Sequence, residues 1–331
     1  MDDHSRNLFG TMPDGSPVYR ARLERSALRV DVITFGAALA DITFAGRSVV
    51  LGCDTLDHYV SKSPHFGAVL GRCANRIARG HLELDGRTHQ LTLNNGRNHM
   101  HGGAPGFSRR NWTLVAQEAR SVTLRIVAED GEQGYPGRVE ASCRYALLGD
   151  NMLEMTLQAT TDRATIVNLS NHSYFNLSDD ATVDAHEVRI AADRYLPLDD
   201  ENIPTGVIAE VADTRFDFRT PRLLGAERFD TPFVLGTAGV HEPRLAASVR
   251  APATGVQLDV LTTQPCVQFY TGQNIRPGVP DRSGRDYRPG AGLCFETQAF
   301  PDAPNQPNFP SIRLDPGQTY RQVIRYLFSQ N

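Results

Sequence analysis

Apolar and polar residues alternate with a period of two along most of this chain, whereas the periodicity of an amphipathic helix is scarce. The segments 28–32, 122–126 and 152–157 show the alternation clearly. Because neighbouring side chains of a strand point to opposite faces, these segments predict strands with one buried face. So many closely spaced strands predict an all-β fold, a large antiparallel β-sandwich of two sheets packed face to face. Further strands are predicted at 139–148, 165–169, 187–191, 256–262, 265–271 and 322–328.

The connections between these strands carry short-range signals of their own. The pair Asp85-Gly86 lies between two strand-like arms in the segment 82–91, and an Asp-Gly pair in that setting predicts a β-hairpin. One short helical turn is predicted at 56–61. The segment 277–292 is rich in glycine and proline and is predicted to be a loop.

The length and charge of the chain narrow the classes of protein to which it can belong. No break in composition divides the 331 residues, so we expect a single domain over residues 1–331. A formal net charge of -4 with 22% charged residues gives no basic patch for a nucleic acid. No apolar run reaches the roughly 18 residues of a membrane span. We therefore expect neither a nucleic acid nor a membrane as a partner.

The cysteines and the first residues bear on the cellular compartment. The five cysteines are odd in number, widely spaced and without a CxxC pair, so they predict reduced thiols rather than disulfides or a zinc site. The opening residues, MDDHSRNLFG, lack the basic start and the apolar stretch of a secretory signal. We therefore expect a cytoplasmic protein. The cysteines are Cys53, Cys73, Cys143, Cys266 and Cys294.

A polar, proline-rich segment near the C-terminus follows the apolar residues 293–295. The segment begins at Glu296 and reads ETQAFPDAPNQPNFP, and its three prolines after Asp302 exclude a helix interior or a central strand. Glu296 is therefore expected at the last pairing position of a strand, facing a cleft walled by the loop that follows. A carboxylate at the end of a strand is often simply solvated, so its position alone does not assign a function.

Two polar segments with chemically versatile side chains lie upstream of it. In GRCANRIARG, Asn75 and Arg76 are either a solvated pair or ligands of hydroxyl groups, because a guanidinium offers five fixed donors. In NNGRNHMHGGAPGFSRRNW, an extended backbone would place His99 and His101 on one face. A metal site would need a third ligand, so this pair alone does not indicate one. A structural role for His101 stays an alternative.

A third polar segment, TIVNLSNHSYFNLSDD, begins as an apolar strand and continues with side-chain amides. Asn168, Asn171 and Asn176 surround His172 in this segment, and a capped turn could use the amides structurally. Side-chain amides both donate and accept hydrogen bonds, which matches the hydroxyl groups of a sugar. His172 is therefore a candidate proton donor.

Several segments, taken together and in order, give the chain a specific resemblance. They are GRCANRI, NHMHGG with GFSRRNW, DGEQGYPG, NLSNHSYFNL, YLPLDDENIPTG, FDFR, GLCFETQAFPDAPNQP and LDPGQTY. In this order, from about Arg20 to the C-terminus, they resemble the aldose 1-epimerase family, also called the galactose mutarotase family.

The resemblance implies a role for individual residues. It implies that Glu296 is the general base and His172 the general acid. It further implies that His101 is a second active-site histidine. Asn75, Arg76 and Asp230 match the residues that bind the sugar.

The chain departs from the family pattern beside Asp230. Family members tend to read YDHNF there, whereas this chain has Thr231 and Pro232 after the aspartate, which bears on the sugar preference. Met100 replaces the usual Leu before His101, a change that conserves volume.

The implied reaction interconverts the α and β anomers of a free aldose such as glucose or galactose. A base takes the proton of the anomeric hydroxyl while an acid protonates the ring oxygen, so neither a metal nor a nucleotide cofactor is expected. With ordinary pKa values of about 4.3 and about 6.5, a glutamate accepts and a histidine donates near neutral pH. A carboxylate close to His172 would further favour the imidazolium form.

Three other functions remain open from the sequence. A non-catalytic carbohydrate-binding module could use the same amides, and a glycosidase could use Asp230 as a second carboxylate. A sugar-phosphate epimerase would need a cationic pocket, for which Arg282, Arg285 and Arg288 are the candidates.

The sequence leaves the preferred aldose and the choice between monomer and homodimer undetermined. Three aromatic residues could stack on a sugar face, although aromatic residues in strands are more often part of a core. They are Tyr174, Phe269 and Phe309.

Overall fold

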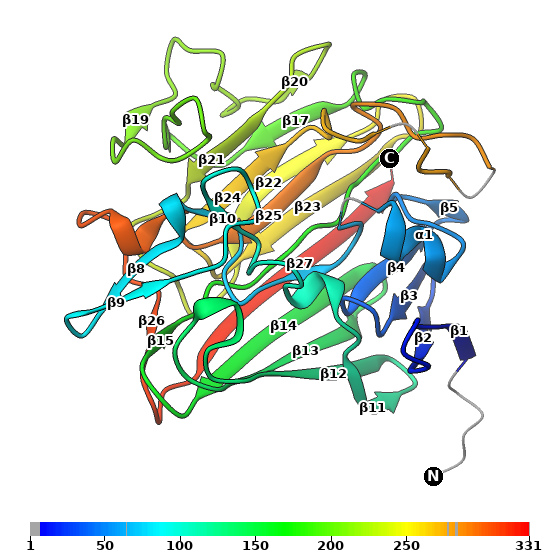
Figure 1. The fold of residues 1–331 in the computed structure, drawn as a ribbon. Helices are drawn as coiled ribbons and strands as arrows, with labels where there is room; N and C mark the ends of the chain where they lie inside the picture. The colour runs from blue at the N-terminus through cyan, green and yellow to red at the C-terminus, as the bar shows by residue number, and fades with distance from the viewer. Residues whose placement is uncertain (1–6, 64, 277, 282–283, 331) are drawn as a thin grey trace.

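A nine-stranded antiparallel sheet forms the larger layer of the molecule (Figure 1). The computed structural model describes residues 7–63, 65–276, 278–281 and 284–330. Strand β27, drawn in red, lies inside this sheet between β14 and β23. In sheet order, the strands are β11 (Thr113–Glu118), β12 (Ser121–Ala128), β13 (Val139–Leu148), β14 (Met152–Thr161), β27 (Tyr320–Gln330), β23 (Val256–Thr262), β22 (Arg244–Arg250), β17 (Glu187–Ile190) and β20 (Arg222–Leu223).

Two separate five-stranded sheets contribute to the same core as the large sheet. The first contains β1 (Asn7–Thr11), β2 (Pro17–Arg25), β3 (Leu28–Ile33), β4 (Ala38–Phe44) and β5 (Arg47–Ser48). The second contains, in sheet order, β19 (Ala209–Glu210), β18 (Arg194–Tyr195), β21 (Asp230–Val234), β24 (Cys266–Tyr270) and β25 (Cys294–Gln298).

Short ladders and single turns connect these layers. The ladders are β7 (Arg76–Ile77) with β10 (His99–Met100), β6 (Val69–Leu70) with β16 (Ser170–Asn171), β15 (Thr165–Ile166) with β26 (Arg313–Leu314), and β8 (His81–Leu84) with β9 (Arg87–Gln90). The helical elements are α1 (Leu56–Ser61) and the 3-10 turns η2 (Ala78–Gly80), η3 (Phe107–Arg109), η4 (Glu132–Gly134) and η5 (Ala303–Asn305).

Side chains from the buried faces of the strands meet between the layers and form the core. The ring of Phe44 in β4 stacks on Phe328 in β27, with centroids 5.6 Å apart. Between β25 and β27, the side-chain amide of Gln322 donates to the carbonyl of Thr297 over 2.7 Å. Phe295 lies in the shared core. Because Phe295 and Thr297 face the large sheet, the alternation of β25 turns Glu296 to the opposite face.

An aromatic cluster stabilises the sheet that carries β25. Phe269 in β24 stacks on Phe229 at 5.6 Å and on Phe295 at 5.3 Å between ring centroids, and its side chain is fully buried. Truncating such a side chain to alanine costs roughly 3–5 kcal/mol of folding free energy. The cluster therefore fixes the backbone on which the candidate site is built.

Most of the sequence predictions about local structure are confirmed. The antiparallel sandwich is present, although two five-stranded sheets, rather than one, lie opposite the large sheet. The helix α1 occupies the predicted residues, and its N-cap Thr55 accepts a hydrogen bond from the backbone of His58. The hairpin of β8 and β9 turns at Asp85 and Gly86, which both have positive φ, as a two-residue turn requires.

Two predicted segments differ from the expectation or lie partly outside the described residues. The strand predicted at 165–169 is interrupted, because β15 ends at Ile166 and β16 begins at Ser170. In the predicted loop 277–292, residues 277, 282 and 283 lie outside the described part of the chain. The rest of that loop contains one isolated bridge, between Pro280 and Asp286, and no longer strand.

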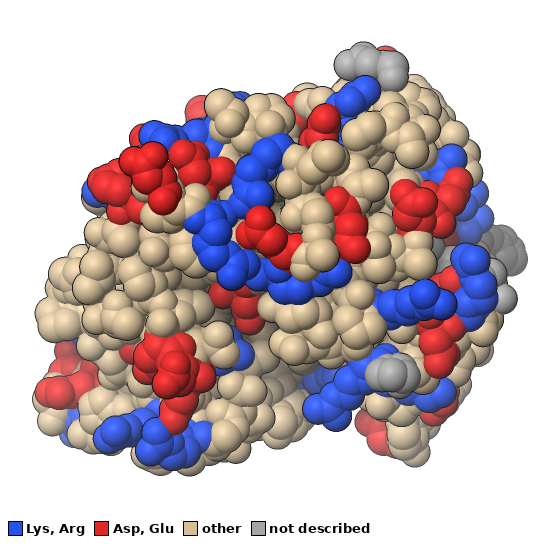
Figure 2. Space-filling model, turned by 90° about the horizontal axis from the view of Figure 1, so that it is seen from above, with Lys and Arg blue, Asp and Glu red and all other residues tan. Residues whose placement is uncertain are grey.

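Charged side chains of both signs lie on the surface, and the cysteines lie in the interior. On the face seen in Figure 2, basic and acidic side chains lie interspersed among other residues. All five cysteines are buried free thiols, as predicted. Burial raises the pKa of Cys73 and of Cys143 to about 12. No helix among the described residues combines the length and apolar character needed to cross a membrane.

Candidate active site

Glu296 lies in the middle of β25, where it pairs with Gln268 of β24, and not at the end of the strand as predicted. Its side chain is 3% exposed, and within the described part of the chain its Oε2 atom has no hydrogen-bond partner. A buried carboxylate oxygen without a partner is costly. This oxygen is therefore positioned for a group that enters from outside the protein.

His172 directly follows the short ladder between β16 and β6. Its backbone continues that ladder, because its N–H donates to Ala68 and its carbonyl accepts from Gly67. The ring stacks on Tyr174, with centroids 4.9 Å apart, and Nδ1 lies 3.5 Å from the thiol sulfur of Cys294. Backbone pairing and ring contacts thus hold the buried imidazole in one orientation.

His101 comes at the end of the ladder between β7 and β10. Its backbone N–H donates to the carbonyl of Asn75, and the backbone N–H of Asn75 donates to Nδ1 of His101 over 3.1 Å. Both residues adopt positive φ, 52° for His101 and 62° for Asn75. This conformation is uncommon for residues other than glycine, and it turns both segments of the backbone sharply beside the ladder.

The extended backbone that would place His99 and His101 on one face is not present. The positive φ of His101 ends the extended run after Met100. His99 is buried elsewhere, with Nε2 2.7 Å from the hydroxyl of Tyr135 and Nδ1 2.7 Å from the carbonyl of Thr92. His99 is therefore a structural histidine.

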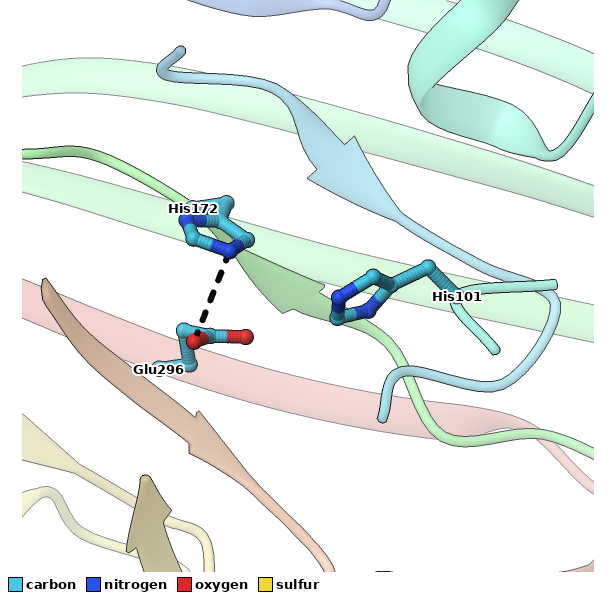
Figure 3. A group of neighbouring side chains, drawn as sticks. All are labelled: His101, His172 and Glu296. Carbon is cyan, nitrogen blue, oxygen red and sulfur yellow. Dashed lines mark ion pairs between the residues drawn. The ribbon is translucent and has the colours of Figure 1, made fainter. Parts of the chain in front are cut away.

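The two remaining histidines and Glu296 meet although they come from distant parts of the sequence. Nε2 of His172 lies 3.6 Å from Oε1 of Glu296, and the rings of His101 and His172 are 5.6 Å apart between centroids. Figure 3 shows the three side chains pointing toward one another from β25 and from the two loop segments. One nitrogen from each ring and one carboxylate oxygen lie within 4.8 Å of one another.

These side chains line a cavity of about 210 Å³. A cavity of about 150 Å³ is known to hold one benzene ring, so this cavity has room for one six-membered ring with its hydroxyl groups. All six residues predicted for the site lie on its wall. The lining residues are His65, Asn75, Arg76, Met100, His101, His172, Tyr174, Asp230, Tyr270, Asn274 and Glu296.

Arg76 and Asp230 bring opposite charges to the wall of the cavity. Nε of Arg76 donates to the side-chain oxygen of Asn95 over 3.0 Å. The side-chain amide of Gln268 donates to Asp230 over 2.6 Å. Each charged group is therefore held by a neutral amide, which leaves the remaining atoms of the guanidinium and the carboxylate for a ligand.

The cavity also contains residues that the sequence did not indicate. His65, Tyr270 and Asn274 were not predicted, because each is a single polar residue without the clustering of amides that marked the other segments. Of the three aromatic residues considered for sugar stacking, Tyr174 lines the cavity. Phe269 and Phe309 belong to hydrophobic clusters instead.

Thr231 and Pro232, where the chain departs from the family pattern, lie on β21 opposite Phe269 and Gln268. Neither is among the residues that line the cavity. At this point of β21, Asp230 therefore lines the cavity, whereas the two residues that depart from the family pattern do not.

Comparison with known proteins decides which family this arrangement represents. The model of the aldose 1-epimerase family matches residues 19–327. This chain belongs to the aldose 1-epimerase family. Membership confirms the predicted family, fold class and isomerase function.

Relatives with similar sequences cover almost the whole chain. The galactose mutarotase of Bos taurus is 42% identical over 340 residues, which cover 98% of each chain. The aldose 1-epimerase of Escherichia coli (strain K12) is 37% identical over 336 residues, which cover 96% of each chain. The matched length includes every residue of the candidate site.

Solved structures support the same assignment. An aldose epimerase homologue from C. elegans has a TM-score of 0.87 at 31% identity and covers 94% of this chain and 99% of its own. A galactose 1-epimerase from Lactobacillus acidophilus has a TM-score of 0.85 at 28% identity and covers 98% of this chain and 99% of its own.

Burial dominates the protonation of the site in this aldose 1-epimerase family member. It lowers the pKa of His172 to about 4. It also raises the pKa of Glu296 well above its ordinary range, and the nearby Asp230 adds to this effect while Arg76 opposes it. Ordinary pKa values therefore do not apply here, because the cost of burying charge outweighs the attraction between the two groups.

The grouping of His101, His172 and Glu296 raises the question of a metal ion. A metal-bound histidine normally uses its second ring nitrogen as a donor to a neighbouring group. Nδ1 of His101 instead accepts from Asn75, so Nε2 carries the proton and has no free electron pair for a metal. The donor set does not fit a metal ion.

Proposed function

We propose that this member of the family opens and recloses the pyranose ring of a free aldose, with Glu296 as base and His172 as acid. Glu296 takes the proton from the hydroxyl on C1, the bond between C1 and the ring oxygen breaks, and His172 protonates the ring oxygen. Rotation about the bond between C1 and C2, followed by the reverse transfers, gives the other anomer. The two protons return to the groups from which they came, so the cycle needs no further reactant.

The pair of Glu296 and His172 can carry out these transfers despite its shifted pKa values. A carboxylate with an imidazolium contains the same number of protons as a carboxylic acid with a neutral imidazole. The two forms differ by the position of one proton between Oε1 and Nε2, which are 3.6 Å apart. The pair therefore titrates as a unit, and its pKa values belong to both groups together.

The observation that carries the proposal is the position of this pair on the wall of a cavity of monosaccharide size, with Oε2 of Glu296 unpartnered within the described residues. A neutral His101, with its proton on Nε2, supplies a fixed donor for a sugar oxygen. Arg76 and Asp230 bind further hydroxyl groups, for which a fork of donors and a carboxylate are suited.

Polarimetry on freshly dissolved α-glucose and α-galactose tests the proposal. The rotation of polarised light should approach its equilibrium value much faster than in buffer alone. The variant Glu296→Gln is the matched control for non-specific effects of added protein. No acceleration by the wild-type chain on any of a panel of hexoses and pentoses would contradict the proposal, and the same panel identifies the preferred aldose.

Two of the rival functions have distinct outcomes in assays, and the structure weighs against the third. A carbohydrate-binding module would bind sugar in calorimetry without accelerating mutarotation. A glycosidase would release nitrophenol from a nitrophenyl glycoside. A sugar-phosphate epimerase is disfavoured because Arg76 is the single cation on the cavity wall within the described residues, beside the carboxylates of Asp230 and Glu296. Of the proposed phosphate ligands, Arg282 lies outside the described residues. Arg285 pairs with Asp281, and neither Arg285 nor Arg288 is among the residues that line the cavity.

We also propose that the chain acts in the cytoplasm as a monomer or homodimer, with residues 1–331 forming one domain. Five unpaired cysteines and a core that joins strands from both ends of the chain support this proposal. Sedimentation of the purified protein measures its oligomeric state.

A further inference from the structure

We propose that His65 is a further substrate-binding residue, which binds a hydroxyl group of the aldose other than the one on the anomeric carbon. The inference rests on the proposed function of the cavity and extends it to the residues that select the sugar. His65 lines the cavity beside the two histidines already described. Its ring centroid lies 5.3 Å from that of His101 and 6.0 Å from that of His172.

One nitrogen of the His65 ring is held by a buried serine. Its Nδ1 lies 2.9 Å from the hydroxyl oxygen of the buried Ser108. Within the described residues, its Nε2 has no hydrogen-bond partner. One nitrogen is therefore anchored by the protein, and the other is left for a ligand.

The carbonyl of His65 accepts a hydrogen bond from the backbone N–H of Ala68 over 3.0 Å. Arg109, the neighbour of Ser108, donates to the carbonyl of Tyr59 over 3.0 Å and to the carbonyl of Ser63 over 2.6 Å. His65 itself has a φ of 71°, which is unfavourable for a residue with a side chain. A residue held in such a conformation often serves a binding site, because the surrounding contacts must offset the cost.

The chemistry of the pair formed by His65 and Ser108 matches a sugar hydroxyl. Burial and the nearby Arg109 keep the pKa of His65 well below its ordinary value, so the ring is neutral. If the hydroxyl of Ser108 donates to Nδ1, then Nε2 carries the proton and donates to the ligand. If the hydroxyl accepts from Nδ1, then Nε2 accepts from the ligand. A sugar hydroxyl has the same double capacity, whereas a charged group does not.

A comparison of variants across a panel of sugars tests this assignment. His65→Phe keeps a flat ring but removes both nitrogens, and it should lower kcat/KM by about 5- to 100-fold, mainly through KM. His65→Gln, which keeps a donor and an acceptor, should restore part of the loss. The matched control is His241→Phe, because His241 is exposed and lies outside the cavity.

Deoxy sugars show whether the loss comes from one hydroxyl. The panel contains glucose, galactose, xylose, 2-deoxyglucose, 3-deoxyglucose, 4-deoxyglucose and 6-deoxygalactose, each as a fresh single anomer, so that every non-anomeric hydroxyl is absent from at least one sugar. The effect of His65→Phe should nearly vanish for the sugar that lacks the bound hydroxyl and persist for the others. An equal loss for every sugar, or no loss for any, would overturn the assignment.

Calorimetry separates failure of this inference from failure of the proposed function. Sugar binding is measured for Glu296→Gln and for the double variant Glu296→Gln with His65→Phe, so that no turnover is needed. Weaker binding by the double variant supports the role of His65 even if the wild-type chain proves inactive. Equal binding by the two variants counts against His65 even if the wild-type chain is fully active.

Discussion

The backbone N–H of Asn75 donates a hydrogen bond to Nδ1 of His101 over 3.1 Å, and this bond fixes the proton of the neutral ring on Nε2. His101 is consequently a permanent donor rather than a group that exchanges protons during the reaction. Burial supports this role, because it keeps the pKa of His101 well below its ordinary value, with further lowering by His65 and His172.

Replacing His101 by Phe should therefore weaken the reaction without changing its dependence on pH. Loss of one buried donor is expected to lower kcat/KM by about 5- to 100-fold. His241→Phe, at an exposed histidine outside the cavity, is the control. A changed pH profile in the His101 variant would show that this residue transfers a proton, contrary to the assignment.

Glu296→Gln should remove the catalysed reaction while leaving the sugar bound. The substitution keeps the shape of the side chain but removes the base, which typically contributes about 10²- to 10⁴-fold to the rate. Polarimetry gives the rate, and calorimetry gives the affinity for galactose. The control is Glu140→Gln, because Glu140 pairs with Arg125 on the surface of the large sheet. Full activity in the Glu296 variant would refute its role as the base.

His172→Asn should lower turnover far more than affinity. The acid acts in the transition state, so a fall of about 10²- to 10⁴-fold in kcat with a small change in KM is expected. Circular dichroism should show an unchanged fold, because Asn can keep one hydrogen bond at this position. Unchanged turnover would transfer the acid role to His101.

The pH profile of kcat/KM should be bell-shaped. Below about pH 4, the value to which burial lowers the pKa of His172, the pair carries two protons and has no base. Above the raised pKa of Glu296, the pair has lost its last proton and has no acid. Asp230 contributes to that raised value, so Asp230→Asn should move the alkaline limb to lower pH.

Polarimetry from about pH 3 to about pH 10, corrected for spontaneous mutarotation, measures both limbs. Circular dichroism at each pH confirms that the protein stays folded. An alkaline limb that does not move in the Asp230 variant would show that Asp230 does not act on Glu296.

Buried histidines outside the cavity should make the fold sensitive to acid. His186 is 1% exposed, accepts a hydrogen bond from the backbone of Leu177, and has its pKa lowered by burial to about 4. Because its folded pKa lies below the unfolded value of about 6.5, its stabilising effect is complete above pH 6.5 and is lost as the pH falls toward 4. The shift corresponds to roughly 3 kcal/mol of unfolding free energy.

Urea denaturation of the wild type and of His186→Asn at about pH 7 and about pH 5 measures this contribution. The free energy of unfolding should fall less with pH in the variant than in the wild type. The raised pKa values of Glu296 and Asp230 act in the opposite direction and are common to both proteins. The exposed His241, replaced by Asn, should leave the slope unchanged.

Local features of the fold could be predicted because they depend on neighbours in the sequence. The hairpin at Asp85 and Gly86 needs two residues that tolerate positive φ, and the alternation along β13 needs one buried face. The division of the second layer into two sheets could not be predicted, because it depends on which distant strands pair.

The six residues predicted for the candidate site lie together on the cavity wall, but their local geometry was not predicted. Glu296 and Thr297 are buried polar residues inside a strand, and polar residues after an apolar run usually mark a strand end. The turn at His101 depends on its pairing with Asn75, which no local pattern reveals. His65 is a single histidine whose partner, Ser108, lies 43 residues away in the sequence.

The central position of β27 has a consequence for the order in which the molecule folds. β27 pairs with β14 on one side and with β23 on the other, and both of these strands precede it in the sequence. Among the described strands of the large sheet, β27 is the one that joins the half ending in β14 to the half ending in β23. Since contacts between distant segments form slowly, we expect the joining of the two halves to limit the rate at which the native state appears.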